Sequence, residues 1–442
     1  MSDRSSPAAR ARAVREALPE GGLFAGQEWR TAVAPFPLGE SLVAELESLG
    51  RVLLQFYRAV NLLYRRSVEG KAPAWVAQVL DQGKPESLIA LQRDAAFKNE
   101  VPRVIRPDVL LTAEGFAISE LDSVPGGIGL TDWLHWAYSS VAPGDRELVG
   151  GPDGLRKGFA SIFGDAQRVH LVVSEESASY RPEMHWLAGR MTGAEYAVRD
   201  GTFTGFGEGD AVYRFFELFD LGQVPSAPVI LEQARAKRIR LTPPPKPIFE
   251  EKLLFALLWN RNLHEFWRQE LGDGFLRRLL AHVPRTWLLD PAPLPPTAAY
   301  PGLELTDWRQ LKGLSQRERE LILKVSGFSA QAWGARGVSL GSDLSTTDWS
   351  IAVESALAAW PQSPHILQKF HRPRVVEFSW MDPATEAVVT MPGRVRLCPY
   401  YFVAGEVATA RPVLGGVLAT VVPADKKIVH GMSEAILAPC TA

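Results

Sequence analysis

Residues 108–122 hold the sequence feature that most restricts the possible folds of this chain. Two runs with strand character are separated by a short turn that ends in a glycine, which is typical of a β-hairpin. A three-residue loop at 113–115 would place Asp108 directly opposite Glu120 on the neighbouring strand. Asp122 lies two residues beyond Glu120, and side chains two apart on a strand share a face. The sequence therefore predicts three carboxylates on one face of a hairpin.

Carboxylates this close together repel one another unless a cation lies among them. A hard divalent cation such as Mg²⁺ prefers oxygen ligands and would resolve the repulsion. We therefore expect Asp108, Glu120 and Asp122 to bind magnesium. In the alternative interpretation, Asp108 caps the entry to its strand after Pro107, and the other two carboxylates face water.

The chain has 442 residues, which is long enough for about three domains. Its 48 basic and 50 acidic residues leave a net charge of -2, which excludes a protein whose main role is to coat nucleic acid or an anionic membrane. No apolar run approaches the roughly 18–20 residues that span a bilayer. Two cysteines, Cys398 and Cys440, cannot form a disulfide scaffold. We expect a cytoplasmic protein with neither a nucleic-acid nor a membrane partner.

Residues 169–198 have the order strand, loop, helix and strand, which is typical of a parallel sheet. Ligands of such sheets bind at the carboxyl ends of the strands, where the loop 174–183 is expected. Tyr180 and Arg181 in this loop are candidates for holding a substrate carboxylate. Arg214 lies inside an apolar strand and needs an anionic partner if it is buried, so it is a further candidate. Purely structural roles are the alternative for these residues.

Lys324 lies near the end of an apolar strand, shortly before a loop that contains three glycines. Such a loop exposes backbone N–H groups that can approach a phosphate closely, and the lysine adds a positive charge. A mobile surface hairpin is the alternative interpretation of this loop. Lys252 begins an apolar helix, and a lysine in that position usually extends into solvent.

Together these segments resemble the ATP-grasp superfamily in its circularly permuted branch, that of glutathionylspermidine synthetase-like and carboxylate–amine ligase-like proteins. In that superfamily an acidic residue is followed, after a short interval, by a Glu-x-Asn pair and a glycine-containing turn. Residues 106–127 match this arrangement, with Asp122 where Asn is more usual. Residues 251–252, 323–327 and 367–370 are similar to the family's earlier ATP-binding lysine, its flap and its adenine hinge. The carboxylates precede the lysines, as in the permuted proteins.

The resemblance covers roughly residues 100–420 and implies an α+β protein. The implied architecture is a permuted ATP-grasp fold with an N-terminal helical segment and an inserted α/β substrate domain. Its segments are an N-terminal helical region (1–100), the metal-site hairpin with its helix (101–150), the α/β substrate domain (151–240), the lysine, flap, hinge and late-strand region (241–425) and a C-terminal tail (426–442).

The resemblance also implies an ATP- and Mg²⁺-dependent ligase that joins a small-molecule or peptide carboxylate to an amine through an acyl phosphate. Lys324 and Arg396 are the implied catalytic residues, and for Arg396 alternating surface charge along a strand is the alternative. The implied contacts to ATP come from Lys252, Lys324, Gly327, Gly334, Gln368, Lys369 and Phe370. Two other functions stay open, an ATP-dependent phosphotransferase and a degenerate, non-catalytic nucleotide-binding or interaction protein.

Overall fold

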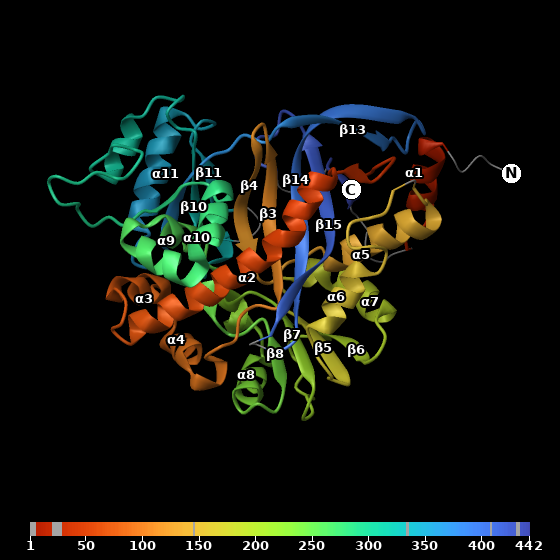
Figure 1. Cartoon of the computed structure of the whole chain (residues 1–442), viewed down its shortest axis with the longest axis horizontal. Helices are drawn as coiled ribbons and strands as arrows, with labels where there is room; N and C mark the ends of the chain where they lie inside the picture. The colour runs from red at the N-terminus through yellow and green to blue at the C-terminus, as the bar shows by residue number, and fades with distance from the viewer. Residues whose placement is uncertain (1–5, 20–28, 145, 333–335, 407–408, 430–433) are drawn as a thin grey trace. The chain divides into compact units, whose positions relative to one another are not determined.

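The computed structural model describes residues 6–19, 29–144, 146–332, 336–406, 409–429 and 434–442. The chain divides into two compact units, and it passes from one to the other repeatedly (Figure 1). Both units contain helices and a sheet, which confirms the expected α+β class. The first unit consists of Met1–Gln55, Ala95–Pro245 and Arg372–Ala442, and the second of Phe56–Asp94 and Lys246–His371.

The large sheet of the first unit is built from Arg30–Thr31 (β1), Phe36–Pro37 (β2), Val104–Thr112 (β3), Gly115–Asp122 (β4), Val375–Met381 (β13), Val388–Ala404 (β14), Arg411–Pro423 (β15) and Ile436–Thr441 (β16). Its main path runs β1-β16-β15-β14-β3-β4, while β13 pairs with β14 and β2 with β16. The short strands β1 and β2 lie parallel to β16, and the other pairs are antiparallel.

The segment 426–442, for which the sequence indicates only a tail, contributes β16 to the interior of this sheet. All residues of β16 are buried, and the strand lies between β15 and β1. Its apolar run is short, and its partners come from both ends of the chain, so no local pattern reveals the pairing. The C-terminal strand is therefore part of the core of the first unit.

A second sheet of the first unit consists of Arg168–Val173 (β5), Glu195–Asp200 (β6), Ala211–Phe215 (β7) and Arg240–Thr242 (β8). The strands lie in the order β6-β5-β7-β8, and the three pairs that they form are parallel. The parallel sheet predicted from residues 169–198 is therefore confirmed. Helix Arg181–Arg190 (α7) follows the loop that leaves the carboxyl end of β5 and precedes β6.

Helix Gly154–Ser161 (α6) packs against β14 and β15 without space for side chains at its glycines. A Cβ added to Gly158 would lie 2.1 Å from a ring carbon of Phe402, and one added to Gly154 would lie 2.2 Å from a backbone oxygen of Gly415. Further helices of the first unit are Pro7–Glu16 (α1), Ile128–Trp136 (α5) and Ala227–Arg235 (α8), with shorter helical turns at Ala95–Phe97, Ala137–Val141, Ala178–Tyr180 and Leu218–Gln223.

Helix Glu40–Val68 (α2) passes from the first unit into the second. Its apolar residues recur at intervals of three and four, as the sequence indicates, and bury one face of the helix. The other helices of the second unit's described part are Ala74–Asp81 (α3), Glu86–Arg93 (α4), Leu254–Trp259 (α9), His264–His282 (α10) and Thr346–Ala358 (α11), with helical turns at Pro247–Glu250, Arg261–Leu263, Trp308–Gly313 and Ala330–Ala332.

The sheet of the second unit is antiparallel and has the order β11-β10-β12-β9. Its strands are Thr286–Leu288 (β9), Leu321–Val325 (β10), Val338–Leu340 (β11) and His365–Lys369 (β12). Trp308 and Trp349 are buried against β10 and β12 in one apolar cluster, so this unit has a core of its own. The buried core explains why the run that ends in Lys324 is apolar.

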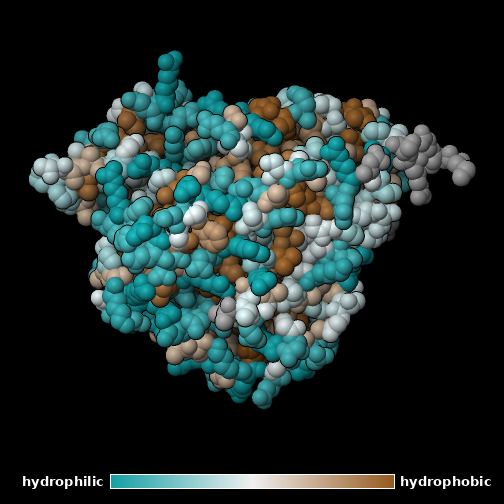
Figure 2. Space-filling model, in the orientation of Figure 1, coloured by the Kyte–Doolittle hydropathy of each residue, from teal (hydrophilic) through white to brown (hydrophobic). Residues whose placement is uncertain are grey.

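Hydrophilic side chains predominate on the face shown in Figure 2, and apolar ones occur there in separate areas. The large apolar side chains that are exposed come from different elements, namely Val68, Ile351, Val375, Val388, Val413 and Ile428. Within the described ranges no helix combines the length and the apolar content that a membrane span requires.

The hairpin of β3 and β4 has the predicted pairing of Asp108 with Glu120, but its turn differs from the prediction. Thr112 pairs with Gly115, so the turn has two residues instead of three. A bulge next to Asp108 leaves Ser119 as the extra residue on β4 and restores the predicted pairing beyond it. The predicted three-residue loop is therefore wrong, and the carboxylate register is right because the bulge compensates for the tighter turn.

Replacing Gly158 with alanine should destabilise the first unit by about 1–3 kcal/mol, because the added Cβ would overlap the ring of Phe402. Urea unfolding measures this change. Gly189→Ala in α7 is the matched control, since a Cβ there meets no atom within 4 Å. We expect that control to be neutral or stabilising by up to about 1 kcal/mol, as alanine favours helix. Equal unfolding free energies for the two variants would contradict the close packing of α6.

Candidate active site

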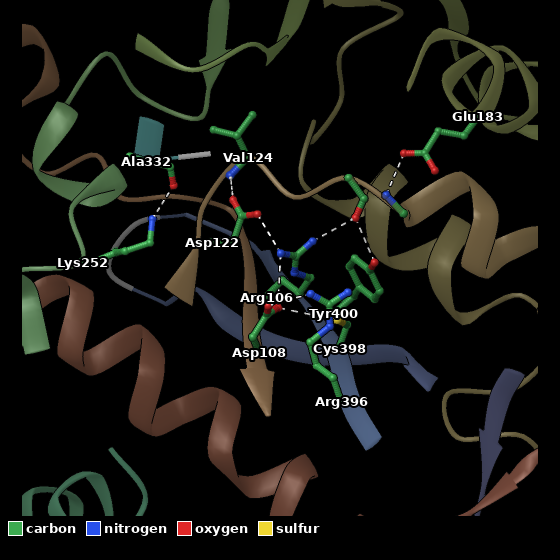
Figure 3. Close-up of polar contacts among 12 residues, drawn as sticks. Arg106, Asp108, Asp122, Val124, Glu183, Lys252, Ala332, Arg396, Cys398 and Tyr400 are labelled. Atoms are coloured by element: carbon green, nitrogen blue, oxygen red, sulfur yellow. Dashed lines mark hydrogen bonds and ion pairs between the residues drawn. The ribbon is translucent and has the colours of Figure 1, made fainter. Parts of the chain in front are cut away.

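Three neighbouring strands of the first unit, β4, β3 and β14, surround the carboxylate of Asp108 with charged side chains (Figure 3). Asp108 lies opposite Glu120 in the ladder. Its two carboxylate oxygens contact Nη2 of Arg106 at 3.2 Å and Nη1 of Arg396 at 3.1 Å. Nη2 of Arg106 also contacts Oδ2 of Asp122 at 2.9 Å. Two guanidinium groups therefore hold two carboxylates of the hairpin.

The charges of this cluster depend on one another because the side chains are largely buried. Burial opposes the charge of Arg106, but the carboxylates of Asp108 and Asp122 raise its pKa well above the usual value. Burial raises the pKa of Asp122, and Arg106 counteracts that rise. The Cys398 thiol lies 3.6 Å from Asp108, and burial raises its pKa to about 11. The thiol is therefore protonated near neutral pH and can donate to the carboxylate.

The donor chemistry of the three carboxylates suits Mg²⁺, but a guanidinium nitrogen bridges Asp108 and Asp122 in this structure. The remaining oxygen of Asp122 accepts the N–H of Val124 at 2.8 Å. Among the described residues, no three acidic, cysteine or histidine side chains are grouped as metal ligands. The magnesium site at Asp108, Glu120 and Asp122 therefore stays a prediction, and it requires Arg106 to give up these contacts.

A glycine turn between β4 and α5 is attached to this cluster from two sides. The carbonyl of Gly126 accepts hydrogen bonds from Arg106 at 3.3 Å and from the Tyr400 hydroxyl at 2.9 Å. Gly127 has φ +87°, and its N–H donates to Oε1 of Glu183 at 2.8 Å. A Cβ on Gly127 would lie 2.5 Å from the Tyr400 hydroxyl, so only glycine allows this approach.

Tyr180, predicted to bind substrate, lies beside the same glycine turn. A Cβ on Gly126 would lie 2.2 Å from its ring. Burial raises the pKa of Tyr180 to about 12, and the charges of Glu183, Arg106, Asp122 and Arg396 also influence it. The structure thus brings the predicted substrate loop and the carboxylate hairpin together in the first unit.

Arg181 and Arg214, the other predicted substrate residues, already have partners within the first unit. Arg181 contacts the carboxylate of Glu175. Arg214 is 1% exposed and donates to three backbone carbonyls, those of Phe216, Pro243 and Pro244. These contacts match the structural alternative, and a role in substrate binding stays a prediction for both arginines.

The second unit holds the residues predicted to contact ATP. Lys324 is buried on β10, between β11 and β12. Lys252 donates from Nζ to the carbonyl of Ala332 at 2.7 Å, so it contacts the loop that follows β10 (Figure 3). A Cβ on Gly327 would lie 2.6 Å from the carbonyl oxygen of Glu250. Lys252 and the start of the glycine loop therefore lie together, while Gly334 lies outside the described residues.

The predicted adenine hinge lies at the end of β12, where the second unit ends in the sequence. Gln368 donates from its side chain to Thr286 at 3.1 Å. The backbone N–H groups of Lys369 and Phe370 donate to the carbonyls of Arg285 and Glu320 at 2.8 and 3.0 Å. Because these N–H groups are paired within the unit, adenine recognition through them stays a prediction that requires an exchange of partners.

The sequence interpretation missed Arg106, Glu183 and Tyr400. Arg106 lies two residues before Asp108 on the same strand, so the period of two places both on one face and could have revealed it. Glu183 and Tyr400 meet the glycine turn through tertiary contacts only. No local pattern indicates their roles.

No protein-family description and no curated protein sequence matches this chain. Its fold, however, matches 45 solved chains. One is a glutathione synthetase-like effector from Globodera pallida in its apo form, with TM-score 0.51 and 10% identity, covering 93% of this chain and 90% of that one. A protein assigned as a gamma-glutamylcysteine synthetase from Methylobacillus flagellatus KT has TM-score 0.35 and 12% identity, covering 88% of each chain. The first likeness shows a shared fold.

The stability of the first unit should depend on pH through Glu183, because burial raises the pKa of its carboxyl from 4.5 to about 7. The folded protein binds this proton more tightly than the unfolded chain does. The contribution of Glu183 to the free energy of unfolding is therefore fully present below about pH 4.5 and is lost as the pH rises through 7. The loss amounts to about 3 kcal/mol between about pH 4 and pH 8.

Urea unfolding of the wild type and of Glu183→Gln across this range tests the prediction. The variant should lack this loss, because the amide carries no charge at any pH. The exposed Glu208→Gln should keep the wild-type pH dependence. A Glu183→Gln variant with the same pH dependence as the wild type would show that Glu183 does not titrate in this way.

Proposed function

We propose that this protein is an ATP-dependent ligase that joins a carboxylate to an amine through an acyl phosphate. The observation that carries the proposal is the pair of partly buried guanidinium groups, Arg106 and Arg396, held by carboxylates beside a glycine turn. Such a centre can stabilise the negative oxygens of a transferred phosphoryl group without a serine or cysteine nucleophile. The shared fold with a glutathione synthetase-like protein is consistent with this chemistry.

In the proposed reaction an oxygen of the substrate carboxylate attacks the γ-phosphorus of ATP, and the bond to the bridging oxygen of ADP breaks. The amine then attacks the acyl carbon, loses a proton and displaces phosphate, which leaves an amide. Arg106 and Arg396 would orient and neutralise the phosphoryl oxygens in both steps. Asp108, Glu120 and Asp122 would hold Mg²⁺, which supplies neutralising charge to the phosphates when it is bound.

The residues of the second unit would bind the nucleotide in this proposal. Lys324 and Lys252 would neutralise phosphate charge, and Lys324 would also serve the transfer step. Tyr180, Arg181 and Arg214 would position the substrate carboxylate, which belongs to a small molecule or a peptide, and the protein would act in the cytoplasm. The other proposed contacts to ATP are those of Gly327, Gly334, Gln368, Lys369 and Phe370.

A non-catalytic nucleotide-binding or interaction protein is the second candidate. The contact of Arg106 with both Asp108 and Asp122, where a catalytic site needs a metal ion, favours it. An ATP-dependent phosphotransferase would share the first step of the ligase but form no amide. The two enzymes differ in their products, and the non-catalytic protein would release no ADP.

Lys324→Ala and Glu120→Gln should each lower the rate of ADP release by about 10²–10³ or more, because Lys324 would neutralise phosphate charge directly and Glu120 would hold the Mg²⁺ that neutralises it. The assay combines Mg-ATP with panels of carboxylic acids and amines, and mass spectrometry then identifies the products. Glu114→Gln, an exposed position in the turn of the same hairpin, is the matched control and should keep the wild-type rate.

Wild-type rates in both Lys324→Ala and Glu120→Gln would show that the active site is assigned wrongly. A phosphorylated product without an amide would identify a phosphotransferase. Thermal unfolding with and without millimolar Mg-ATP separates the non-catalytic candidate, which is stabilised by the nucleotide but releases no ADP. No stabilisation of the wild type would count against the ligase and the phosphotransferase and would favour a non-catalytic interaction protein.

A further inference from the structure

A buried ion pair lies next to the candidate nucleotide lysine in the second unit. Nζ of Lys84 lies 2.5 Å from Oε1 of Glu251, and the two side chains are each 1% exposed. Ions so removed from water persist only when geometry and further hydrogen bonds compensate for the lost hydration. Lys84 belongs to the connection between α3 and α4, outside the region that resembles a known family. This N-terminal segment therefore contributes the counter-charge of Glu251, the residue that precedes Lys252.

The second oxygen of Glu251 connects the ion pair to the strand that carries Lys324. The hydroxyl of Ser326 donates to Oε2 of Glu251 and accepts the N–H of Leu253 at 2.9 Å. The carbonyl of Ser326 accepts the N–H of Lys252 at 2.9 Å. These bonds fix the backbone of Lys252 to the residue from which the glycine loop begins.

The first residues of that loop pack directly on Glu251. A Cβ on Gly327 would lie 2.8 Å from the carboxyl carbon of Glu251, so only glycine allows the loop to pass so close. The ring of Phe328 has its centroid 5.8 Å from Nζ of Lys84. A change in the ion pair would therefore be transmitted to the loop through contacts with both partners.

Lys84 itself is held by its neighbours in the sequence. Gly83 has φ +73°, and a Cβ there would lie 1.8 Å from the carbonyl oxygen of Gln362. The side chain of Gln82 donates to the carbonyl of Trp360. The loop that carries Lys84 is thus attached to the segment after α11. These contacts fix the position of the Lys84 backbone, from which the ammonium group extends.

We propose that Lys84 is a positioning residue of the nucleotide site, acting through Glu251 and Ser326 on Lys252 and on the start of the glycine loop. The inference rests on the proposed function, in which Lys252 and this loop contact ATP. Without the charge of Lys84, the Glu251 carboxylate would be buried without its counter-ion, and its bond to Ser326 would no longer have a fixed geometry. Lys84 touches no reacting group, so its loss should weaken nucleotide binding more than it slows the chemistry.

Hydrogen exchange in the absence of nucleotide tests the structural part of this proposal. In Lys84→Met, the amides of Lys252, Leu253 and Ser326 should exchange at least tenfold faster than in the wild type. Lys312→Met is the matched control, because Lys312 pairs with Glu354 in the same unit at the same 2.5 Å but with side chains 35% and 47% exposed. Unchanged exchange of the three amides in a folded Lys84→Met protein would overturn the proposal. Should that variant not fold, Glu251→Gln keeps the shape of the side chain and provides the same test.

Nucleotide titrations then separate this inference from the proposed function. In both Lys84→Met and Glu251→Gln, the KM or Kd for Mg-ATP should rise at least tenfold, with kcat changed by less than a factor of three. Lys312→Met should match the wild type. A wild type that binds no Mg-ATP would refute the proposed function, whereas a wild type that binds it as tightly as the two variants would refute the positioning role. A fall in kcat with an unchanged KM would also contradict the positioning role.

Discussion

The buried carboxylate of Asp108 is the charge on which the geometry of the candidate site depends. Burying a carboxylate without a partner is strongly unfavourable, so a chain that leaves Asp108 only 7% exposed must supply counter-charges. Arg106 provides one from the same strand, and Arg396 provides the other from β14, 288 residues away. Pairing of β14 with β3 therefore joins the hairpin to the rest of the large sheet and also brings Arg396 to Asp108.

The second unit also contains a buried carboxylate that needs a counter-charge, that of Glu251. Here the counter-charge comes from Lys84, and the remaining oxygen is satisfied by Ser326 at the start of the glycine loop. Glycine at position 327 is required by this packing, because a Cβ there would overlap Glu251. Glycine would also allow the backbone of the loop to approach a phosphate closely. Gly327 thus contributes both to the stability of the unit and to its proposed function. A substitution at this position would therefore affect both properties.

The sequence predicts well what depends on neighbouring residues. The hairpin, the opposition of Asp108 and Glu120, and the parallel sheet after residue 169 follow from local periodicity. The bulge at Ser119 could not be predicted, because no local pattern shows which residue of β4 lacks a partner on β3. The partners Lys84 and Glu251 are 167 residues apart, and nothing in their local sequence connects them. What escapes prediction is therefore a pairing of charges that are distant in the sequence, such as Lys84 with Glu251.

The position of Arg106 also gives a physical reason for aspartate at position 122. An asparagine, more usual in the family that the sequence resembles, would keep an oxygen for a metal ion but would carry no charge to hold a guanidinium. Asp122 contacts Arg106 at 2.9 Å, and Mg²⁺ bound by the hairpin would compete with Nη2 of Arg106 for the same oxygens. Arg106 freed in this way would still be attached to the carbonyl of Gly126 through Nη1. In the proposed function, metal binding and the release of Arg106 toward a phosphoryl group are therefore one coupled equilibrium.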